Sequence, residues 1–128
     1  AWAALLDERG LRWRGLSRPD FDITSRDAVA AAVEPGTATV INCTAYANVD
    51  AAESDHPAVP AVNGTGVGLL AERCREGGAT LVHYSTDYVF SGRADAPYPI
   101  DAPREPLGAY ARSKALGEEL VEASGCAY

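Results

Sequence analysis

A tyrosine and a lysine four positions apart have the residue types and the spacing for proton transfer. Tyr110 and Lys114 stand at positions i and i+4, which share one face of a helix. The pKa of an isolated tyrosine is about 10, and a nearby ammonium group favours the phenolate and lowers that value. Such a pair could deliver a proton to a carbonyl oxygen while hydride reaches the carbonyl carbon. A bare Tyr-x-x-x-Lys is weak evidence, because the two residues often meet by chance on helices.

A threonine earlier in the chain strengthens this interpretation. Thr86 lies within Ser85-Thr86-Asp87, at the end of an apolar run that predicts a buried strand. Its hydroxyl could donate a hydrogen bond to the same carbonyl oxygen. A threonine at a strand end, then a loop, then a helix with Tyr110 and Lys114 is a much more specific pattern than the pair alone. We therefore predict that Thr86, Tyr110 and Lys114 are catalytic.

Helices and strands must alternate along the chain to bring these residues together. The pattern predicts a helix at 1–9 closed by Gly10, a strand at 11–16, a helix capped by Thr24 or Ser25 and ended before Pro35, a strand at 39–43, a helix at 57–76 ended by Gly77-Gly78, a strand at 80–84, a proline-bearing loop, and a helix at 107–123. Such alternation predicts an α/β fold with a parallel sheet and right-handed crossovers. The apolar strand at 39–43 is expected to be covered on both faces. Gly64, Gly66 and Gly68 either weaken their helix or mark close packing against a neighbour.

Composition limits the classes of function. The chain has 128 residues, enough for one domain with a core, and is 47% hydrophobic and 23% charged. A formal net charge of −7 argues against binding to nucleic acid or to anionic membranes. No apolar run approaches the roughly 20 residues that span a bilayer. Cys43, Cys74 and Cys126 are widely spaced, so we expect no metal site and three free thiols in a reducing cytoplasm.

Two longer strings resemble a known family. They are Tyr-Ser-Thr-Asp-Tyr-Val-Phe-Ser-Gly at 84–92, and Pro-Leu-Gly-Ala-Tyr-Ala-Arg-Ser-Lys at 106–114 followed by Gly117-Glu118. Both closely resemble the extended short-chain dehydrogenase/reductases, and within that group most of all the dTDP-4-dehydrorhamnose reductases. Asp22-Ile23-Thr24, the stretch 40–46 with Val49-Asp50 and Ala52-Glu53, and Asn63-Gly64-Thr65 fit the same family. The similarity runs from about residue 11 to about residue 120.

The resemblance implies a fold and a reaction. The fold would be Rossmann-like, a doubly wound parallel sheet with helices on both faces. The reaction would be the NAD(P)H-dependent reduction of a nucleotide-linked 4-keto-6-deoxy sugar, in dTDP-L-rhamnose or deoxysugar biosynthesis. Tyr110 would protonate the C4 oxygen, and Lys114 would bind the nicotinamide ribose. Thr86 would orient the ketone, and Asp87 would contact the sugar.

The same resemblance places the cofactor. Ala45 and Tyr46 would line its cleft at the carboxyl end of a strand, where ligands of open α/β sheets bind. Asp22 and Ile23 would lie near the adenine, and Asn63 could support Lys114 through a water molecule. An acidic residue at the end of the second strand would favour NAD, but this position reads Gly-Leu-Ser-Arg. Arg18 could neutralise a 2′-phosphate, which favours NADPH over NADH.

The chain also departs from the family. It has no Gly-x-x-Gly-x-x-Gly turn to bind the pyrophosphate, and the family's C-terminal substrate lobe would follow Tyr128. We therefore interpret residues 1–128 as a partial NAD(P)-binding Rossmann domain of a longer reductase. This segment alone is expected to be inactive and to bind cofactor poorly, because a sheet without its central strand exposes its edges.

Several alternatives stay open. The family resemblance is also compatible with a sugar-nucleotide epimerase or dehydratase, or with a non-catalytic subunit similar to the β subunit of methionine adenosyltransferase. At the residue level, Asp87 could be a turn residue. Asp22 could cap a helix in a box with Thr24 and Asp27. Asp50 and Glu53 would be charges at a helix start.

The remaining expectations concern the two histidines and the partners. His83 is expected to be a packed core residue rather than a ligand, and His56 an exposed loop residue. A nucleotide sugar is the expected small-molecule partner, and neither nucleic acid nor membrane is expected. The enzyme would be cytoplasmic and could form a homodimer.

Overall fold

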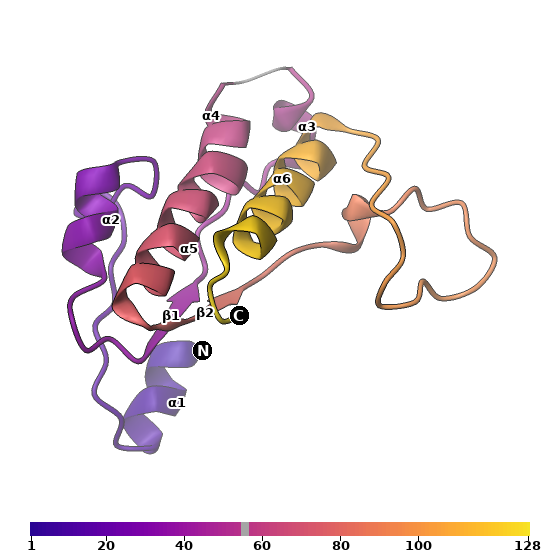
Figure 1. Ribbon diagram of the computed structural model, residues 1–128. Helices are drawn as coiled ribbons and strands as arrows, with labels where there is room; N and C mark the ends of the chain where they lie inside the picture. The colour runs from indigo at the N-terminus through magenta and orange to yellow at the C-terminus, as the bar shows by residue number, and fades with distance from the viewer. Residues whose placement is uncertain (55–56) are drawn as a thin grey trace.

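A two-stranded parallel sheet with helices packed on one face forms the centre of the molecule (Figure 1). The computed structural model describes residues 1–54 and 57–128, so the expectation for His56 lies outside the described residues. The described elements are α1 (Trp2–Glu8), α2 (Arg26–Ala32), β1 (Thr39–Asn42), α3 (Val49–Ala52), α4 (Ala58–Pro60), the π-helical η1 (Ala61–Thr65), α5 (Gly66–Gly77), β2 (Thr80–His83), the 3₁₀-helical η2 (Asp87–Val89) and α6 (Ala109–Ser124). No helix in these two ranges is long and apolar enough to cross a membrane.

The sheet is parallel, as the alternation of elements predicted. β1 and β2 pair in register from Thr39 opposite Thr80 to Asn42 opposite His83. After α6 the chain returns to the same sheet, where Ala127 forms a parallel bridge with Thr80 and its carbonyl accepts a 2.8 Å hydrogen bond from the Leu81 amide. The carboxyl ends of both strands therefore lie at one edge of the sheet, beside the start of α6.

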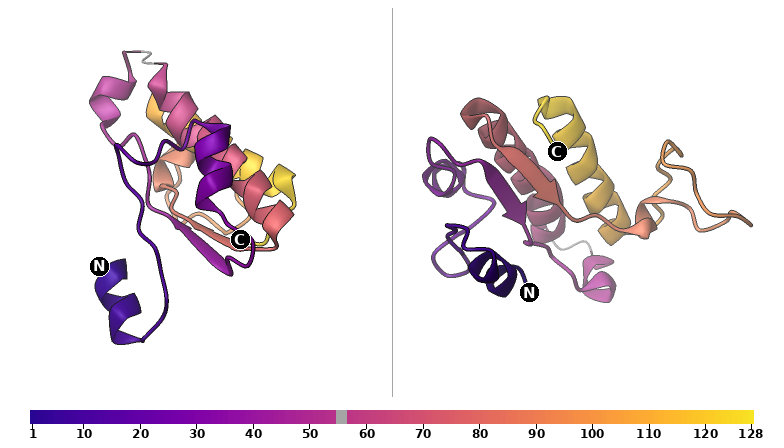
Figure 2. Two further views of the ribbon diagram at one scale, coloured as in Figure 1. Left: turned by 90° about the vertical axis from the view of Figure 1, so that its left-hand side faces the viewer. Right: turned by 90° about the horizontal axis from the view of Figure 1, so that it is seen from below.

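Helices α2, α5 and α6 cover one face of the strands, and α1 lies on the other side (Figure 2). The core lies between those three helices and β2, and includes Val29, Leu70, Leu81 and Val121. No side chain of α1 is buried. The fold class is confirmed as a small Rossmann-like parallel α/β arrangement.

Two details of the predicted sheet are wrong. Residues 11–16 form no strand. An extended segment becomes a strand only through hydrogen bonds to a neighbouring strand, whereas this one is held by Arg14, which bonds the carbonyl of Ala32 at 2.8 Å and Glu34 at 2.9 Å. β1 is also less covered than expected, because Val40 and Ile41 stay half-buried and the packed helices lie on one face only.

The helix predicted at 57–76 is continuous but irregular. It passes from α4 through the π turn η1 into α5, and Gly78 ends it in the left-handed conformation at φ 71°. Its glycines were expected either to weaken the helix or to mark close packing against a neighbour, and the structure shows close packing. A Cβ on Gly64 would lie 2.5 Å from Leu116 of α6, and one on Gly117 of α6 would overlap the Asn63 carbonyl oxygen. The predicted caps are confirmed for α2, where the Ser25 hydroxyl accepts from the Ala28 amide at 3.2 Å. Cys43, Cys74 and Cys126 are free thiols, as predicted.

Candidate active site

Thr86 lies directly after β2, where the strand gives way to η2. Its backbone is extended, and its hydroxyl accepts a 3.3 Å hydrogen bond from the Tyr88 amide, so Thr86 caps η2. The same hydroxyl donates to the Asp87 carboxylate at 3.2 Å. The Thr86 side chain is half-buried and Asp87 is exposed. Asp87 therefore occupies the first turn of η2, and its carboxylate stays open to solvent beside the threonine hydroxyl.

Tyr110 lies in the first turn of α6 and faces the segment that follows Thr86. Its ring meets the ring of Tyr88 edge to face, with centroids 6.1 Å apart. The Tyr110 amide donates a 3.4 Å hydrogen bond to the Glu53 carboxylate. Gly108, which precedes α6, supplies no side-chain cap, so Glu53 serves the helix start from another part of the chain.

Glu53 corrects one sequence-based expectation. Asp50 is in the first turn of α3, as predicted, but Glu53 follows the end of α3 instead of starting it. Its negative charge lies at the N-terminus of α6, where the helix dipole favours an anion. Glu53 is therefore a charge at a helix start, as predicted, but the helix is α6 instead of α3.

Lys114 lies one turn after Tyr110 and is only 3% exposed. Its ammonium group donates a hydrogen bond to the Tyr84 carbonyl at the end of β2, and lies 3.4 Å from His83 Nε2. Burial lowers the pKa of Lys114, while the nearby Glu118 carboxylate opposes that shift. The lysine is thus held at the strand end by the Tyr84 carbonyl.

His83 links Lys114 to the neighbouring strand. The Asn42 side-chain oxygen accepts from the Thr44 amide at 2.9 Å, which leaves its NH₂ group to face His83 Nδ1 at 3.1 Å. Burial first, and then the Lys114 charge, lower the pKa of His83 to about 4. His83 is half-buried rather than a fully packed core residue. Sequence reasoning missed Asn42 and His83 as part of this site, although both occupy the last position of their strands.

Asn63 joins three elements of the site. Asn63 is 1% exposed. Its side-chain oxygen accepts from the Tyr46 amide at 2.8 Å, and its NH₂ group donates to the Tyr46 carbonyl at 3.0 Å and to the Ser113 hydroxyl at 3.0 Å. Ser113 in turn donates to the Tyr110 carbonyl at 2.7 Å. These bonds fix the loop after β1 against α6. The contacts of Asn63 therefore go to Tyr46 and Ser113, and no hydrogen bond described for Asn63 reaches Lys114.

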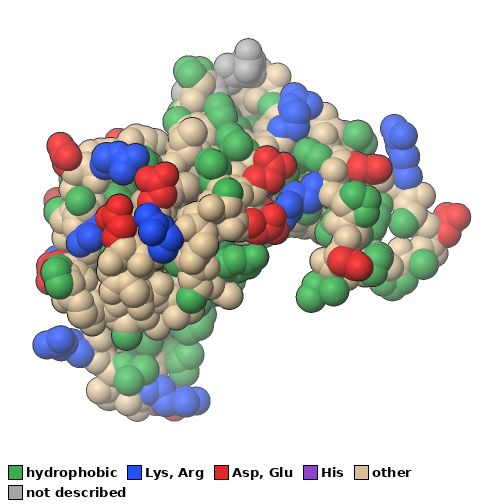
Figure 3. Space-filling model, in the orientation of Figure 1, with side chains coloured by type: hydrophobic (Ala, Val, Ile, Leu, Met, Phe, Trp, Pro, Cys, Tyr) green, Lys and Arg blue, Asp and Glu red, His purple; other side chains and the backbone are tan. Residues whose placement is uncertain are grey.

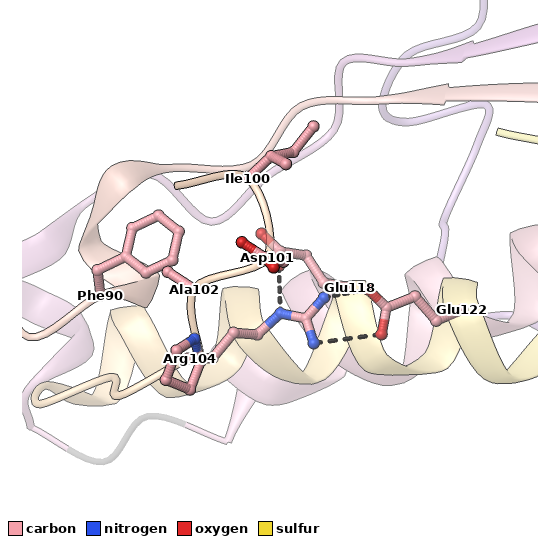
Figure 4. Close-up of a pocket in the computed structure, with 8 residues that line it drawn as sticks. Phe90, Ile100, Asp101, Ala102, Arg104, Glu118 and Glu122 are labelled. Atoms are coloured by element: carbon pink, nitrogen blue, oxygen red, sulfur yellow. Dashed lines mark hydrogen bonds and ion pairs between the residues drawn. The ribbon is translucent and has the colours of Figure 1, made fainter. Parts of the chain in front are cut away.

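An ion-pair network lies beside the strand end, next to a cavity of about 310 Å³ (Figure 4). Arg104, from the proline-bearing loop, donates to Glu118 at 2.5 Å and also pairs with Glu122 on the next turn of α6. The Ser85 hydroxyl donates to the other oxygen of Glu118. Phe90 and Ile100 add apolar walls. The proline-bearing loop thus forms a rim beside the segment that carries Thr86.

The residues expected on the adenine side lie at the start of α2. The Asp22 carboxylate accepts from the Thr24 amide at 2.9 Å and from the Thr24 hydroxyl at 2.7 Å. These hydrogen bonds lower the pKa of Asp22, and the Arg18 charge adds to the effect. Asp22 therefore closes a local turn, and Ser25 rather than a box of Thr24 and Asp27 caps the helix.

The remaining cofactor candidates differ in exposure. Ile23 is 2% exposed and belongs to the core, so its side chain faces away from solvent. Ala45 is exposed and Tyr46 is half-buried in the loop after β1. The structure thus gathers Thr86, Tyr110 and Lys114 at one strand end, while Arg18 and Asp22 form a second group before α2.

The chain was compared with known proteins. A family model described as the RmlD substrate binding domain matches residues 1–128. A dTDP-4-dehydrorhamnose reductase from Streptomyces griseus is 46% identical over 118 residues, which are 91% of this chain and 39% of that protein. A dTDP-4-keto-6-deoxy-D-glucose reductase from Streptomyces niveus is 42% identical over 107 residues, 83% of this chain and 37% of that protein.

Solved structures similar to this chain include two enzymes named dTDP-4-dehydrorhamnose reductase. A dTDP-4-dehydrorhamnose reductase from Clostridium acetobutylicum superposes with a TM-score of 0.89 at 33% identity, covering 94% of this chain and 44% of that one. The enzyme of the same name from Bacillus anthracis, solved in complex with NADP, gives 0.87 at 28% identity, covering 98% and 46%. The chain therefore spans about two fifths of the length of the relatives that it matches.

Proposed function

Because the chain belongs to the RmlD substrate-binding domain family, we propose that its protein reduces the C4 ketone of a nucleotide-linked 4-keto-6-deoxy sugar with NADPH or NADH. The observation that carries this proposal is the position of Lys114. It is buried at the end of β2, one helical turn from Tyr110, and Tyr110 touches the ring that follows Thr86 and Asp87. The reductases named among the relatives support the same reaction.

The residues of the site divide the chemistry between them. Tyr110 gives its phenolic proton to the C4 oxygen, and the Thr86 hydroxyl turns from the Asp87 carboxylate to donate its hydrogen bond to the same oxygen. Lys114 keeps one N–H on the Tyr84 carbonyl and directs its others to the cofactor ribose and towards Tyr110. Asp87, exposed beside Thr86, contacts the sugar hydroxyls. The bound nicotinamide supplies the hydride.

Residues 1–128 fit part of an NAD(P)-binding domain. Ala45 and Tyr46 follow β1 at the edge where Lys114 lies, the place where ligands of open parallel sheets bind. Arg18 and Asp22 lie together before α2, where a guanidinium could meet a 2′-phosphate. The NADP complex of the Bacillus anthracis relative supports NADPH as the cofactor.

Turnover by the complete natural protein tests the reaction. NADPH oxidation is measured with a dTDP-4-keto-6-deoxyhexose, for the unmodified protein, Tyr110→Phe and the matched control Tyr88→Phe. Loss of the proton donor should lower kcat by about 10²–10⁴-fold, whereas Tyr88→Phe keeps its ring contact and should stay within a few-fold. Tight cofactor binding with no turnover in the unmodified protein would instead favour the regulatory-subunit alternative.

Cofactor choice has its own test. If Arg18 binds the 2′-phosphate, Arg18→Ala should raise the KM for NADPH about tenfold and leave the KM for NADH nearly unchanged. A preference for NADH that Arg18→Ala does not alter would contradict the assignment.

The cytoplasmic location and the homodimer expected from the sequence remain proposals. Sedimentation of the complete protein tests the homodimer.

A further inference from the structure

Glu118 connects the strand end to the proline-bearing loop through one carboxylate. The Ser85 hydroxyl donates to one of its oxygens, and the Arg104 guanidinium donates to the other at 2.5 Å. The Glu118 side chain is 22% exposed, and it lies one helical turn after Lys114 on α6. Both oxygens of a partly buried carboxylate are thus used by two separate segments of the chain.

Ser85 immediately precedes Thr86, so a bond to Ser85 acts on the backbone that carries the threonine hydroxyl. Lys114 also joins this strand end to α6, through a hydrogen bond to the Tyr84 carbonyl and a 3.4 Å contact with His83 Nε2. Tyr84, Ser85 and Tyr88 therefore contact three successive turns of α6, through Lys114, Glu118 and Tyr110. Hydrogen bonds to a charged acceptor are the stronger kind.

Arg104 holds the carboxylate in the orientation that Ser85 needs. Its guanidinium bonds Glu118 through Nε and also pairs with Glu122. The adjacent Glu105 amide donates to the Val89 carbonyl at 2.8 Å, which fixes this end of the loop against η2. Figure 4 shows Arg104 lying along α6 between the two glutamates.

We propose that Glu118 is a positioning residue for the ketone reduction, which holds Ser85 against α6 and thereby sets the Thr86 hydroxyl relative to Tyr110. The inference rests on the proposed function. It goes further in assigning a role to a carboxylate whose described hydrogen bonds go to Ser85 and Arg104. A shift of about 1 Å in such a group can cost about 10²-fold in rate.

The test compares four single variants and one double variant in the complete natural protein. Glu118→Ala and Ser85→Ala should each lower kcat about tenfold or more, with the dissociation constant for NADPH within about twofold of the unmodified value. Glu118→Gln keeps one acceptor oxygen for Ser85, but it loses the second acceptor for Arg104 and the negative charge near Lys114, so it should recover only part of kcat. Glu122→Ala is the matched control, because it removes a partner of Arg104 but not of Ser85, and should stay within about twofold.

The double variant separates positioning from general stability. If Glu118 acts through Ser85, Ser85→Ala with Glu118→Ala should be no slower than Glu118→Ala alone. Two effects that multiply, or a Glu118→Ala enzyme with unchanged kcat, would overturn the proposal. Equal losses of kcat in Glu118→Ala and Glu122→Ala would also overturn it, because they would assign the effect to the loop.

A second readout keeps this proposal separate from the reductase assignment. Absence of turnover in the unmodified protein would reject the function, while amide exchange would still test the contact. Glu118→Ala should speed exchange of the Phe90 amide, which bonds the Asp87 carbonyl at 3.0 Å, and Glu122→Ala should not. Unchanged exchange in Glu118→Ala would reject the positioning role.

Discussion

At the residue scale, Lys114 and His83 share a buried site in which one positive charge disfavours another. Their side-chain nitrogens lie 3.4 Å apart, and His83 also faces the Asn42 amide. Burial lowers the pKa of both side chains, and the lysine charge lowers the pKa of His83 further. Because His83 is neutral, it places no second positive charge beside Lys114, which favours the charged form of the lysine.

This arrangement predicts a pH dependence of folding stability. The pKa of His83 falls from 6.5 to about 4 on folding, so between those values the unfolded chain binds more protons than the folded one. Its contribution to stability is complete above about pH 6.5 and is lost as the pH falls towards 4. We expect the protonation of His83 to lower the free energy of unfolding by about 1–3 kcal/mol between pH 6.5 and pH 4.

Urea unfolding at a series of pH values checks the prediction. His83→Gln removes the titrating group, so its free energy of unfolding should vary less between pH 6.5 and pH 4 than that of the unmodified chain. An equal slope for both proteins would contradict the assignment to His83.

The sequence predicts the residues of this site unevenly. Spacing alone brings Tyr110 and Lys114 to one helix face, and the strand end places Thr86 near them. Asn42 and His83 have no such signal, because the pairing register of the two strands decides that these side chains meet. Glu118 shares the helix face of Lys114 by spacing, but the order of residues does not specify its contacts with Ser85 and Arg104.

At the element scale, the close packing of η1 against α6 depends on two glycines, which have no side chain to hold the helices apart. Gly64 faces Leu116, and Gly117 faces the Asn63 backbone so closely that any Cβ there would overlap its carbonyl oxygen. The Asn63 side chain bonds Tyr46 and Ser113 at the same crossing. The position of Tyr110 on α6 thus depends on how closely the two helices approach.

Gly117→Ala should therefore destabilise the fold. Adding a methyl group at this contact forces the helices apart and should cost about 1–3 kcal/mol or more. Gly77→Ala is the matched control, since a Cβ at Gly77 meets nothing within 4 Å, and it should be neutral or stabilise by up to about 1 kcal/mol. Chemical denaturation of both variants checks this, and equal stabilities would contradict the close-approach argument.

The sequence pattern predicted the helix that contains α5, but it did not predict the π turn η1 within it. Val67, Leu70, Ala71 and Cys74 are buried at ordinary helical spacing and predict α5. Val62 and Val67 are both buried although they are five positions apart, a spacing that suits an i→i+5 turn rather than an α-helix. That spacing was the available signal for η1. The failed strand at 11–16 had no such signal, because a strand depends on its hydrogen-bonded neighbour.

At the scale of the whole molecule, one part is densely packed and the other is loosely attached. Helices α2, α5 and α6 share the core with β2. By contrast, α1 buries no side chain and reaches the sheet end through a 2.8 Å hydrogen bond from the Trp2 indole to the Tyr84 hydroxyl. Residues 11–20 are all exposed.

Amide hydrogen exchange should divide the 128-residue chain accordingly. Amides at 2–16 should exchange orders of magnitude faster than those at 70–74 in α5, because few buried apolar contacts protect them. Arg14→Ala should accelerate exchange at 11–17 further and leave α5 unchanged, since Arg14 bonds the end of α2. Comparable protection in both regions would contradict this division.

The burial of Lys114 also makes it a chemical reporter, because it is the only lysine among these 128 residues. An amine-selective reagent that modifies an ε-amino group in this stretch can modify no other residue. In the folded chain Lys114 is 3% exposed, so acylation of its amine should be slow until the strand end opens. The mass of the peptide carrying Lys114 would then record, with a single adduct, how often this end of β2 becomes accessible to solvent.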